Sequence, residues 1–207
     1  MSVRELLLAS GNKKKLTELE SLLAPLGIQL RSPDDVGGLP EVDEDRPTFA
    51  GNAEKKACSA ASASGMWALG DDSGLCVDHL DGAPGVFSAR YAGTHGDDQG
   101  NNKKLLAELA GVPESDRGAH FVCAIALARP DGSLECVLEG ETHGRILEAP
   151  RGEGGFGYDP LFLFTEPGHP ATGRGFAELT GDEKGSVSHR GRALAQLARR
   201  ISSLPVS

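Results

Sequence analysis

Two adjacent aspartates, Asp71 and Asp72, follow an apolar run and come directly before Ser73. Their carboxylates are therefore predicted at a strand end, where open α/β sheets carry their functional groups. Buried side by side, two carboxylates repel each other unless a cation or a shared proton intervenes. Their hard oxygen atoms favour Mg²⁺ over zinc. Further carboxylates are available from Glu41, Asp43, Glu44 and Asp45. The pair thus indicates a magnesium site, with turn-forming aspartates as the alternative.

A cationic turn is predicted after the first apolar run. Ser10, Gly11 and Asn12 lead there into the consecutive lysines Lys13, Lys14 and Lys15. At a helix N-terminus, free backbone N–H groups and the helix dipole favour an anion. The spacing is not that of a Walker A loop. The stretch is either a phosphate cradle or a capped surface helix with solvated lysines.

A glycine-rich loop and a group of donors complete the candidate set. The loop "GGFGYDP" places Phe156 and Tyr158 on either side of Gly157, with Asp159 next to them. A planar base could approach such an aromatic face closely, although a turn with core aromatics has the same composition. Near the start of the last predicted helix, the donors are Lys184, His189 and Arg190. Together, these four groups have the chemistry needed to bind a nucleoside triphosphate: a phosphate cradle, carboxylates, an aromatic face and hydrogen-bond donors. A water molecule activated by a carboxylate and a metal ion could then attack a phosphoanhydride bond.

The elements that must position these groups follow from apolar periodicity and turn residues. Strands are predicted over 3–9, 66–73, 75–80, 119–128, 134–144 and 161–164. Helices are predicted over 13–27, 49–64, 97–111 and 188–201. In this scheme one strand breaks at the acidic pair and then resumes, and Asp131-Gly132 makes a hairpin turn. The segment 32–47 is expected to be an exposed loop, and 86–93 serves either a cleft or an interface.

Composition limits the class of protein. A chain of 207 residues with 39% hydrophobic residues suits one α/β domain or two closely joined lobes. The net charge of −9 argues against long nucleic acid, whereas the local lysines favour small anions. No apolar run reaches about 18 residues and no signal peptide is evident, so we expect a cytoplasmic protein without a membrane segment. The four separated cysteines are expected to be free thiols rather than disulfides or zinc ligands.

In order along the chain, five blocks resemble those of the inosine/xanthosine triphosphate pyrophosphatase family. They are "ASGNKKKLTELESLL", "TFAGNAEKKA", "GDDSGLCVDHLDGAPGVFSARYAG", "GGFGYDPLF" and "AELTGDEKGSVSHRGRAL". The resemblance implies an elongated mixed β-sheet flanked by helices, with two lobes and a central cleft, over a single domain of residues 1–207. It also implies Mg²⁺-dependent hydrolysis of ITP, dITP and XTP to the monophosphate and pyrophosphate, in a homodimer.

The same resemblance implies roles for individual residues. Asp72 corresponds to the proton acceptor and metal ligand, and Glu44 to the second metal carboxylate. Triphosphate contacts fall on Ser10, Gly11, Asn12, Lys13, Lys14 and Lys15, with a further substrate contact at Ser73. The base-binding loop corresponds to Phe156, Gly157, Tyr158 and Asp159. The donors that read the purine 6-oxo group correspond to Lys184, His189 and Arg190.

One position departs from the family pattern, which often has Glu-Asn-Ala where this chain has Gly51-Asn52-Ala53. Asp45 and Glu54 are the candidates to replace the missing carboxylate. Two other functions remain open at this stage: a Maf-like pyrophosphatase acting on dTTP or UTP, and a nucleotide-sensing or RNA-binding module without turnover. The "SHR" block at 188–190 argues against the Maf-like pyrophosphatase, because in the resemblance this block recognises purines. The net charge argues against RNA binding.

Overall fold

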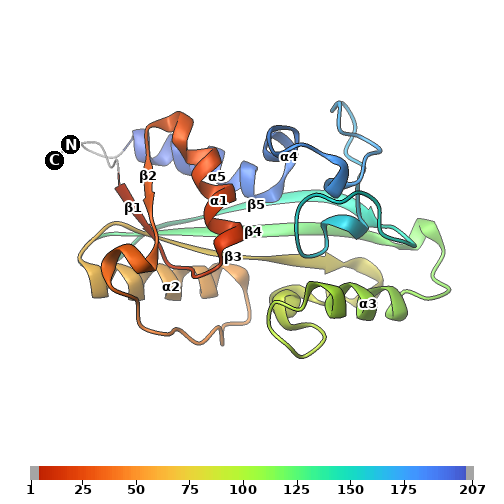
Figure 1. The fold of residues 1–207 in the computed structure, drawn as a ribbon, viewed down its shortest axis with the longest axis horizontal. Helices are drawn as coiled ribbons and strands as arrows, with labels where there is room; N and C mark the ends of the chain where they lie inside the picture. Colours follow the sequence, from red (N-terminus) through yellow and green to blue (C-terminus); the bar gives the residue numbers. More distant parts are fainter. Residues whose placement is uncertain (1–4, 204–207) are drawn as a thin grey trace. The chain divides into compact units, whose positions relative to one another are not determined.

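The computed structural model describes residues 5–203 and contains a six-stranded mixed sheet with the order β2-β1-β3-β4-β5-β6 (Figure 1). The strands are β1 (Glu5–Leu8), β2 (Gln29–Arg31), β3 (Ala68–Val77), β4 (Gly118–Ala128), β5 (Leu134–Ile146) and β6 (Phe162–Phe164). Strand β1 pairs in parallel with β2 and β3, whereas β5 and β6 are antiparallel. The predicted α/β fold with a mixed sheet is confirmed.

Five α-helices accompany these strands in the described part of the chain. They are α1 (Lys13–Leu23), α2 (Phe49–Ser64), α3 (Asp98–Glu108), α4 (Gly181–Val187) and α5 (His189–Ser202). None of them has the length and hydrophobicity that a membrane span requires. The chain divides into two compact units, described separately below. Unit 1 comprises Met1–Asp72, Cys123–Gly140 and Arg190–Ser207, and unit 2 comprises Ser73–Val122 and Glu141–His189.

Unit 1 has helices on both faces of its strands. Leucines of β1 and β3 that point to one face, such as Leu8 and Leu69, join a buried cluster with Leu19 of α1 and Leu197 of α5. The opposite face receives α2, whose small residues permit close approach. At Gly70 of β3, an added Cβ would lie 2.0 Å from the carbonyl oxygen of Ala53. The small side chains of α2 and the glycine of β3 therefore set the distance between helix and strand.

Unit 2 is built around aromatic side chains. The rings of Phe121 and Phe162 lie 4.7 Å apart, and Phe162 and Phe176 lie 4.8 Å apart. Leu105 of α3 is buried in the same cluster. Arg117 is buried, and its guanidinium donates to the backbone oxygens of Leu109, Ile146 and Leu147, each at 2.9 Å. Burial of this charge is tolerated because its donors find backbone acceptors.

Several predicted elements differ from the structure. The strand does not break at the acidic pair, because β3 runs without interruption through Ala68–Val77. The first helix ends at Leu23, after which a 3-10 turn and the left-handed Gly27 close it. Strand β2 and helix α4 were not predicted, since each is too short to show periodicity. Of the predicted first strand 3–9, positions 3 and 4 lie outside the described residues.

Other boundaries agree with expectation. Thr48 caps α2 by accepting from the N–H of Gly51 at 3.1 Å. The turn at Asp131-Gly132 joins β4 to β5, and the N–H of Gly132 donates to the backbone oxygen of Arg129 at 2.8 Å. Most of 32–47 is irregular and at least partly exposed, although Pro33–Val36 forms a 3-10 turn.

Candidate active site

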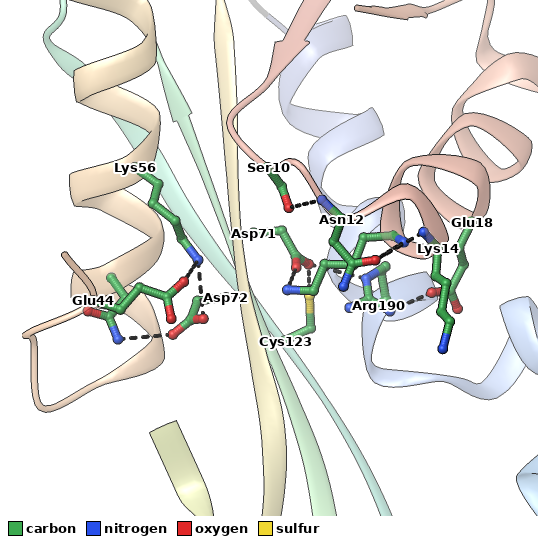
Figure 2. A network of polar contacts seen from close by, with 12 residues as sticks. Ser10, Asn12, Lys14, Glu18, Glu44, Lys56, Asp71, Asp72, Cys123 and Arg190 are labelled. Atoms are coloured by element: carbon green, nitrogen blue, oxygen red, sulfur yellow. Dashed lines mark hydrogen bonds and ion pairs between the residues drawn. The ribbon is translucent and has the colours of Figure 1, made fainter. Parts of the chain in front are cut away.

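Asp71 and Asp72 point to opposite faces of β3 (Figure 2). Successive side chains of a strand alternate between faces, so a continuous strand separates two neighbouring carboxylates. Asp71 faces Lys15 of α1 and Arg190 of α5, whereas Asp72 faces Asn52 and Lys56 of α2. The two carboxylates therefore do not lie side by side, although the expectation that cations offset their charges holds. Each aspartate instead has its own cationic partners.

Asp71 is buried, and a cationic side chain contacts each of its two carboxylate oxygens. Its Oδ1 forms an ion pair with Lys15 Nζ, and its Oδ2 accepts from Arg190 Nε at 3.2 Å and from the Cys123 thiol at 3.2 Å. Only 1% of Asp71 is exposed. Burial by itself would raise the pKa of this carboxyl, but Arg190 and Lys15 outweigh it and hold the pKa well below its usual range. Asp71 is accordingly a fixed negative charge.

Asp72 lies in a different electrostatic environment. Its Oδ1 contacts Lys56 Nζ at 3.2 Å and its Oδ2 accepts from Asn52 Nδ2 at 3.1 Å. Lys56 also donates to Glu44 Oε1 at 2.7 Å, so one ammonium group holds two carboxylates. Burial raises the pKa of Asp72, Lys56 opposes the shift, and Glu44 adds to it; the net direction is upward.

The two neighbouring aspartates thus have pKa values shifted in opposite directions. Such divergence is characteristic of sites in which one carboxylate stays ionised and the other exchanges a proton. By this criterion Asp72 is the candidate proton acceptor, and Asp71 is the residue that holds Lys15 and Arg190 in place.

The donor set around Lys56 fits a magnesium ion. Mg²⁺ is commonly bound by one or two carboxylates, with substrate phosphates and water completing the shell. Asp72 and Glu44 supply two hard oxygen donors that converge on one ammonium group. Across residues 5–203, no group of three or more Asp, Glu, His or Cys side chains is arranged to hold a metal. Asp72 and Glu44 are thus the residues that would hold such an ion.

The turn before α1 is shaped by its own side chains. Asn12 caps the helix, and its Oδ1 accepts from the N–H groups of Lys14 at 3.0 Å and Lys15 at 3.2 Å. Ser10 Oγ accepts from the N–H of Asn12 at 3.2 Å. The cap thus uses two N–H groups that were expected to be free for an anion. Electrostatic attraction from the lysine side chains and the helix dipole remains available there.

Arg190 is the bulkiest fully buried side chain among the described residues. Besides Asp71, its guanidinium contacts Glu18 Oε2 of α1 at 2.5 Å. Burial opposes the charge, but Asp71 and Glu18 raise the pKa of Arg190 above its usual value. Arg190 therefore links α1, β3 and α5 through two carboxylates (Figure 2). Its predicted contact with a purine stays a prediction.

Gly51, where the family often has glutamate, lies at the start of α2 next to Arg46. A Cβ at this position would lie 3.0 Å from Arg46 Cβ. The candidate replacement Asp45 contacts Lys55 at 2.9 Å and Arg46 at 3.9 Å. Lys56, by contrast, is held by Glu44 and Asp72. Asp45 therefore stabilises the adjoining lysine of α2.

In unit 2, the glycine loop forms a compact turn around Asp159. This carboxylate accepts from the N–H of Phe156 at 2.9 Å and from Lys184 Nζ at 2.6 Å. Lys184 Nζ also lies 5.1 Å from the centre of the Phe156 ring. Tyr158 is buried and donates its hydroxyl to the Ser88 backbone oxygen at 2.9 Å. The structure therefore brings together all four predicted loop residues and Lys184.

The remaining predicted residues belong to the two units as follows. His189 is buried in unit 2, where its ring stacks on Phe121 with 4.7 Å between centroids and 13° between planes. Ser73 is the first residue of unit 2 and continues β3 beyond Asp72. Lys13 and Lys14 are exposed at the first turn of α1 in unit 1.

Sequence reasoning missed several residues of these networks. Glu18 contacts Arg190, and Cys123 contacts Asp71. Asp98 and Asn102 of α3 contact the glycine loop. The i,i+4 spacing of Asp98 and Asn102 on a predicted helix was a usable signal, since such residues share a face. Glu18 and Cys123 gave no local signal, because their partners are distant in the sequence.

The fold and these groups define a class: an α/β protein with an open mixed sheet that carries lysines and carboxylates suited to a phosphate ester and a divalent cation. Comparison with known proteins narrows the class. The model of the Ham1 family matches residues 6–200. The chain belongs to the Ham1 family.

Individual relatives agree with this assignment. A protein of Geobacter sulfurreducens named dITP/XTP pyrophosphatase is 53% identical over 93% of this chain and 94% of its own length. A Streptomyces coelicolor protein of the same name is 49% identical, over 96% and 98%. A HAM1 protein from Coxiella burnetii has a structure that superposes with a TM-score of 0.84 at 40% identity, over 97% of this chain and 99% of that one.

Proposed function

We propose that this protein hydrolyses non-standard purine nucleoside triphosphates, ITP, dITP and XTP, to the nucleoside monophosphate and pyrophosphate. The observation that carries the proposal is the convergence of Asp72 and Glu44 on Lys56, on the face of β3 opposite Asp71. Relatives at about half identity that are named dITP/XTP pyrophosphatase support the substrate class. Hydrolysis of such triphosphates removes them from the nucleotide pool.

Unit 1 supplies the phosphate chemistry in this proposal. Lys13, Lys14 and Lys15 bind the triphosphate, with Ser10, Gly11 and Asn12 forming the turn that presents them. Asp72 accepts the proton of the attacking water, a role that its raised pKa supports. Asn52 holds Asp72 Oδ2 at 3.1 Å and so orients the carboxylate.

Magnesium is the proposed cofactor, held by Asp72 and Glu44. When bound, the ion supplies positive charge that stabilises negative charge developing on the phosphate oxygens. Lys56 fixes the distance between the two carboxylates, since both contact its ammonium group.

A second group of residues is proposed to recognise the base. Phe156 and Tyr158 with Gly157 and Asp159 form the base-binding loop, Ser73 adds a substrate contact, and Lys184, His189 and Arg190 are the proposed donors to the 6-oxo group. A 6-oxo purine offers an acceptor where adenine has an amino donor, so a cationic donor stabilises the first and leaves the second unpaired. Guanine shares the oxygen, and its 2-amino group must therefore account for its rejection.

The remaining parts of the proposal follow from this substrate class. We propose that residues 1–207 act as one catalytic domain and that two copies form a homodimer. The nucleotide pool that this reaction would clean lies in the cytoplasm, where we place the protein.

A substrate panel tests the proposal. ITP, XTP, ATP, GTP, dTTP and UTP are offered in competition with Mg²⁺ present, and pyrophosphate and orthophosphate are both measured. We expect ITP and XTP to be consumed first, with pyrophosphate as product. A preference for dTTP or UTP would instead support a Maf-like pyrophosphatase, and binding of ITP without any product would support a nucleotide sensor.

A further inference from the structure

Two residues of α3 hold the glycine loop by its backbone. In unit 2, the N–H of Gly157 donates to Asp98 Oδ2 at 3.1 Å, and the Gly157 carbonyl accepts from Asn102 Nδ2 at 2.9 Å. Asp98 and Asn102 are four residues apart, so they lie on the same face of the helix. Both polar backbone groups of one residue are thus bonded to side chains one helical turn apart.

This contact matters because the loop lacks a regular backbone ladder. Gly155 and Gly157 adopt left-handed conformations, with φ of 73° and 61°. Asp159 ties the loop from one end by accepting from Phe156 and Lys184, and the Tyr158 hydroxyl ties it to Ser88. The centre of the loop, Gly157, depends on α3.

The same helix also holds the segment that contains Ser88. Asn101 Oδ1 accepts from the N–H of Ala92 at 2.7 Å, and its Nδ2 donates to the Ala89 carbonyl at 3.4 Å. Side chains of α3 therefore order both the glycine loop and the segment to which Tyr158 is bonded. Whether residues 86–93 also serve a cleft or an interface stays a prediction.

We infer that Asp98 and Asn102 are positioning residues that pre-order the base-binding loop through Gly157. The inference rests on the proposed function, because it takes Phe156–Asp159 as the loop that binds the purine. A loop that is already ordered binds without the conformational entropy that a mobile loop loses on binding. Loss of either contact should therefore weaken base binding and leave phosphate binding intact.

The test compares Asp98→Ala and Asn102→Ala with two matched variants. Asp98→Asn keeps an oxygen acceptor for the Gly157 N–H and should restore much of the wild-type behaviour. Asp97→Ala is the structural control, because Asp97 caps α3 by accepting from the Gly100 N–H at 2.9 Å, and its neighbour rather than Asp97 contacts the loop.

The readouts separate the base from the phosphates. KM and kcat are measured with ITP, and calorimetry gives the Kd of inosine monophosphate and of pyrophosphate. For Asp98→Ala we expect KM and the Kd of inosine monophosphate to rise about tenfold to a hundredfold, as for one hydrogen bond to a charged group. Asn102→Ala should raise both about twofold to tenfold, as for a neutral bond. Pyrophosphate binding should be unchanged in both.

Three results would contradict the inference. They are wild-type values of KM and of inosine monophosphate binding in both alanine variants, an equal loss of inosine monophosphate and pyrophosphate binding, and the same KM change in Asp97→Ala as in Asp98→Ala. Failure of the proposed function can be told apart from failure of this inference, because it is seen in the wild-type protein and not only in the variants. A wild-type protein that neither hydrolyses ITP nor binds inosine monophosphate would refute both the function and the positioning role.

Discussion

Asp71 and Asp72 are adjacent in β3, but Asp71 stabilises the structure whereas Asp72 is the candidate for chemistry. Asp71 is paired with Lys15 and Arg190, whereas Asp72 shares Lys56 with Glu44. Their charges face opposite sides of the strand. Substitution of each aspartate by asparagine should consequently affect different properties of the protein.

Asp72→Asn should lower kcat by about 10²- to 10⁴-fold, the range expected for loss of a positioned general base. The free energy of unfolding should fall by less than in Asp71→Asn, because Lys56 keeps Glu44 as a carboxylate partner, whereas Asp71 pairs with both Lys15 and Arg190. Pyrophosphate release and urea unfolding measure the two effects. Near-normal turnover in this variant would refute the assignment of Asp72.

Asp71→Asn should destabilise the fold by about 3–5 kcal/mol, as is typical when one partner of a buried ion pair is removed. Arg190 would remain buried with one carboxylate, Glu18, of the two it now contacts. Urea unfolding at constant pH measures the change, with Asp72→Asn as the matched control. Equal stability of the two variants would contradict the distinction between the aspartates.

The contact between α2 and β3 depends on a residue without a side chain. Gly70→Ala would place a methyl group 2.0 Å from the Ala53 carbonyl oxygen, so helix or strand must shift. We expect a loss of about 1–3 kcal/mol together with reduced turnover, because α2 carries Asn52 and Lys56. Gly181→Ala at the start of α4 is the control, since its Cβ meets nothing within 4 Å. A stable, active Gly70→Ala variant would show that α2 need not pack this closely.

Helix α4 should show an acid-dependent contribution to stability through Glu183. A hydrogen bond from Arg174, with further bonds from Thr180, lowers the pKa of Glu183 to about 2. A depressed carboxyl pKa contributes stability above the unfolded-state value and loses it as the pH falls toward the folded-state value. The Tm difference between wild type and Glu183→Gln should therefore narrow between about pH 4.5 and pH 2. A constant difference would exclude this contribution.

The sequence predicted some helices and strands more accurately than others. Helices α1, α2, α3 and α5 followed from periodicity and caps, because each is long enough to show a repeated apolar face. The course of β3 was predicted wrongly, since two aspartates and two glycines disfavour a strand locally. Arg190, Lys15 and Lys56 override that preference by neutralising the carboxylates. Those partners are far away in the sequence, and a local pattern contains no information about them.

The candidate site was predicted in part for the same reason. Residue types and order indicated the three lysines at 13–15, the pair Asp71-Asp72 and the glycine loop. The resemblance to a family singled out Lys15, Asp72 and Glu44. The assignment of opposite faces to Asp71 and Asp72 required a continuous strand. The contacts of Asp98 and Asn102 with Gly157 required the tertiary structure, because 59 and 55 residues, respectively, separate the bonded partners.

The whole molecule is expected to need a divalent cation for turnover but not for folding. Lys56 contacts both Asp72 and Glu44, so we expect these carboxylates to keep their positions without a metal. Removal of metal with EDTA should abolish pyrophosphate release, and added Mg²⁺ should restore it, while Tm changes little. A large fall in Tm on chelation would instead indicate a structural metal.

The identity of the products from ITP tests the central claim most directly. Phosphorus NMR of the reaction with wild-type protein and Mg²⁺ distinguishes cleavage between the α and β phosphates from release of the terminal phosphate. We predict inosine monophosphate and pyrophosphate in equal amounts, without inosine diphosphate. Formation of inosine diphosphate and orthophosphate, or the absence of any product, would contradict the account.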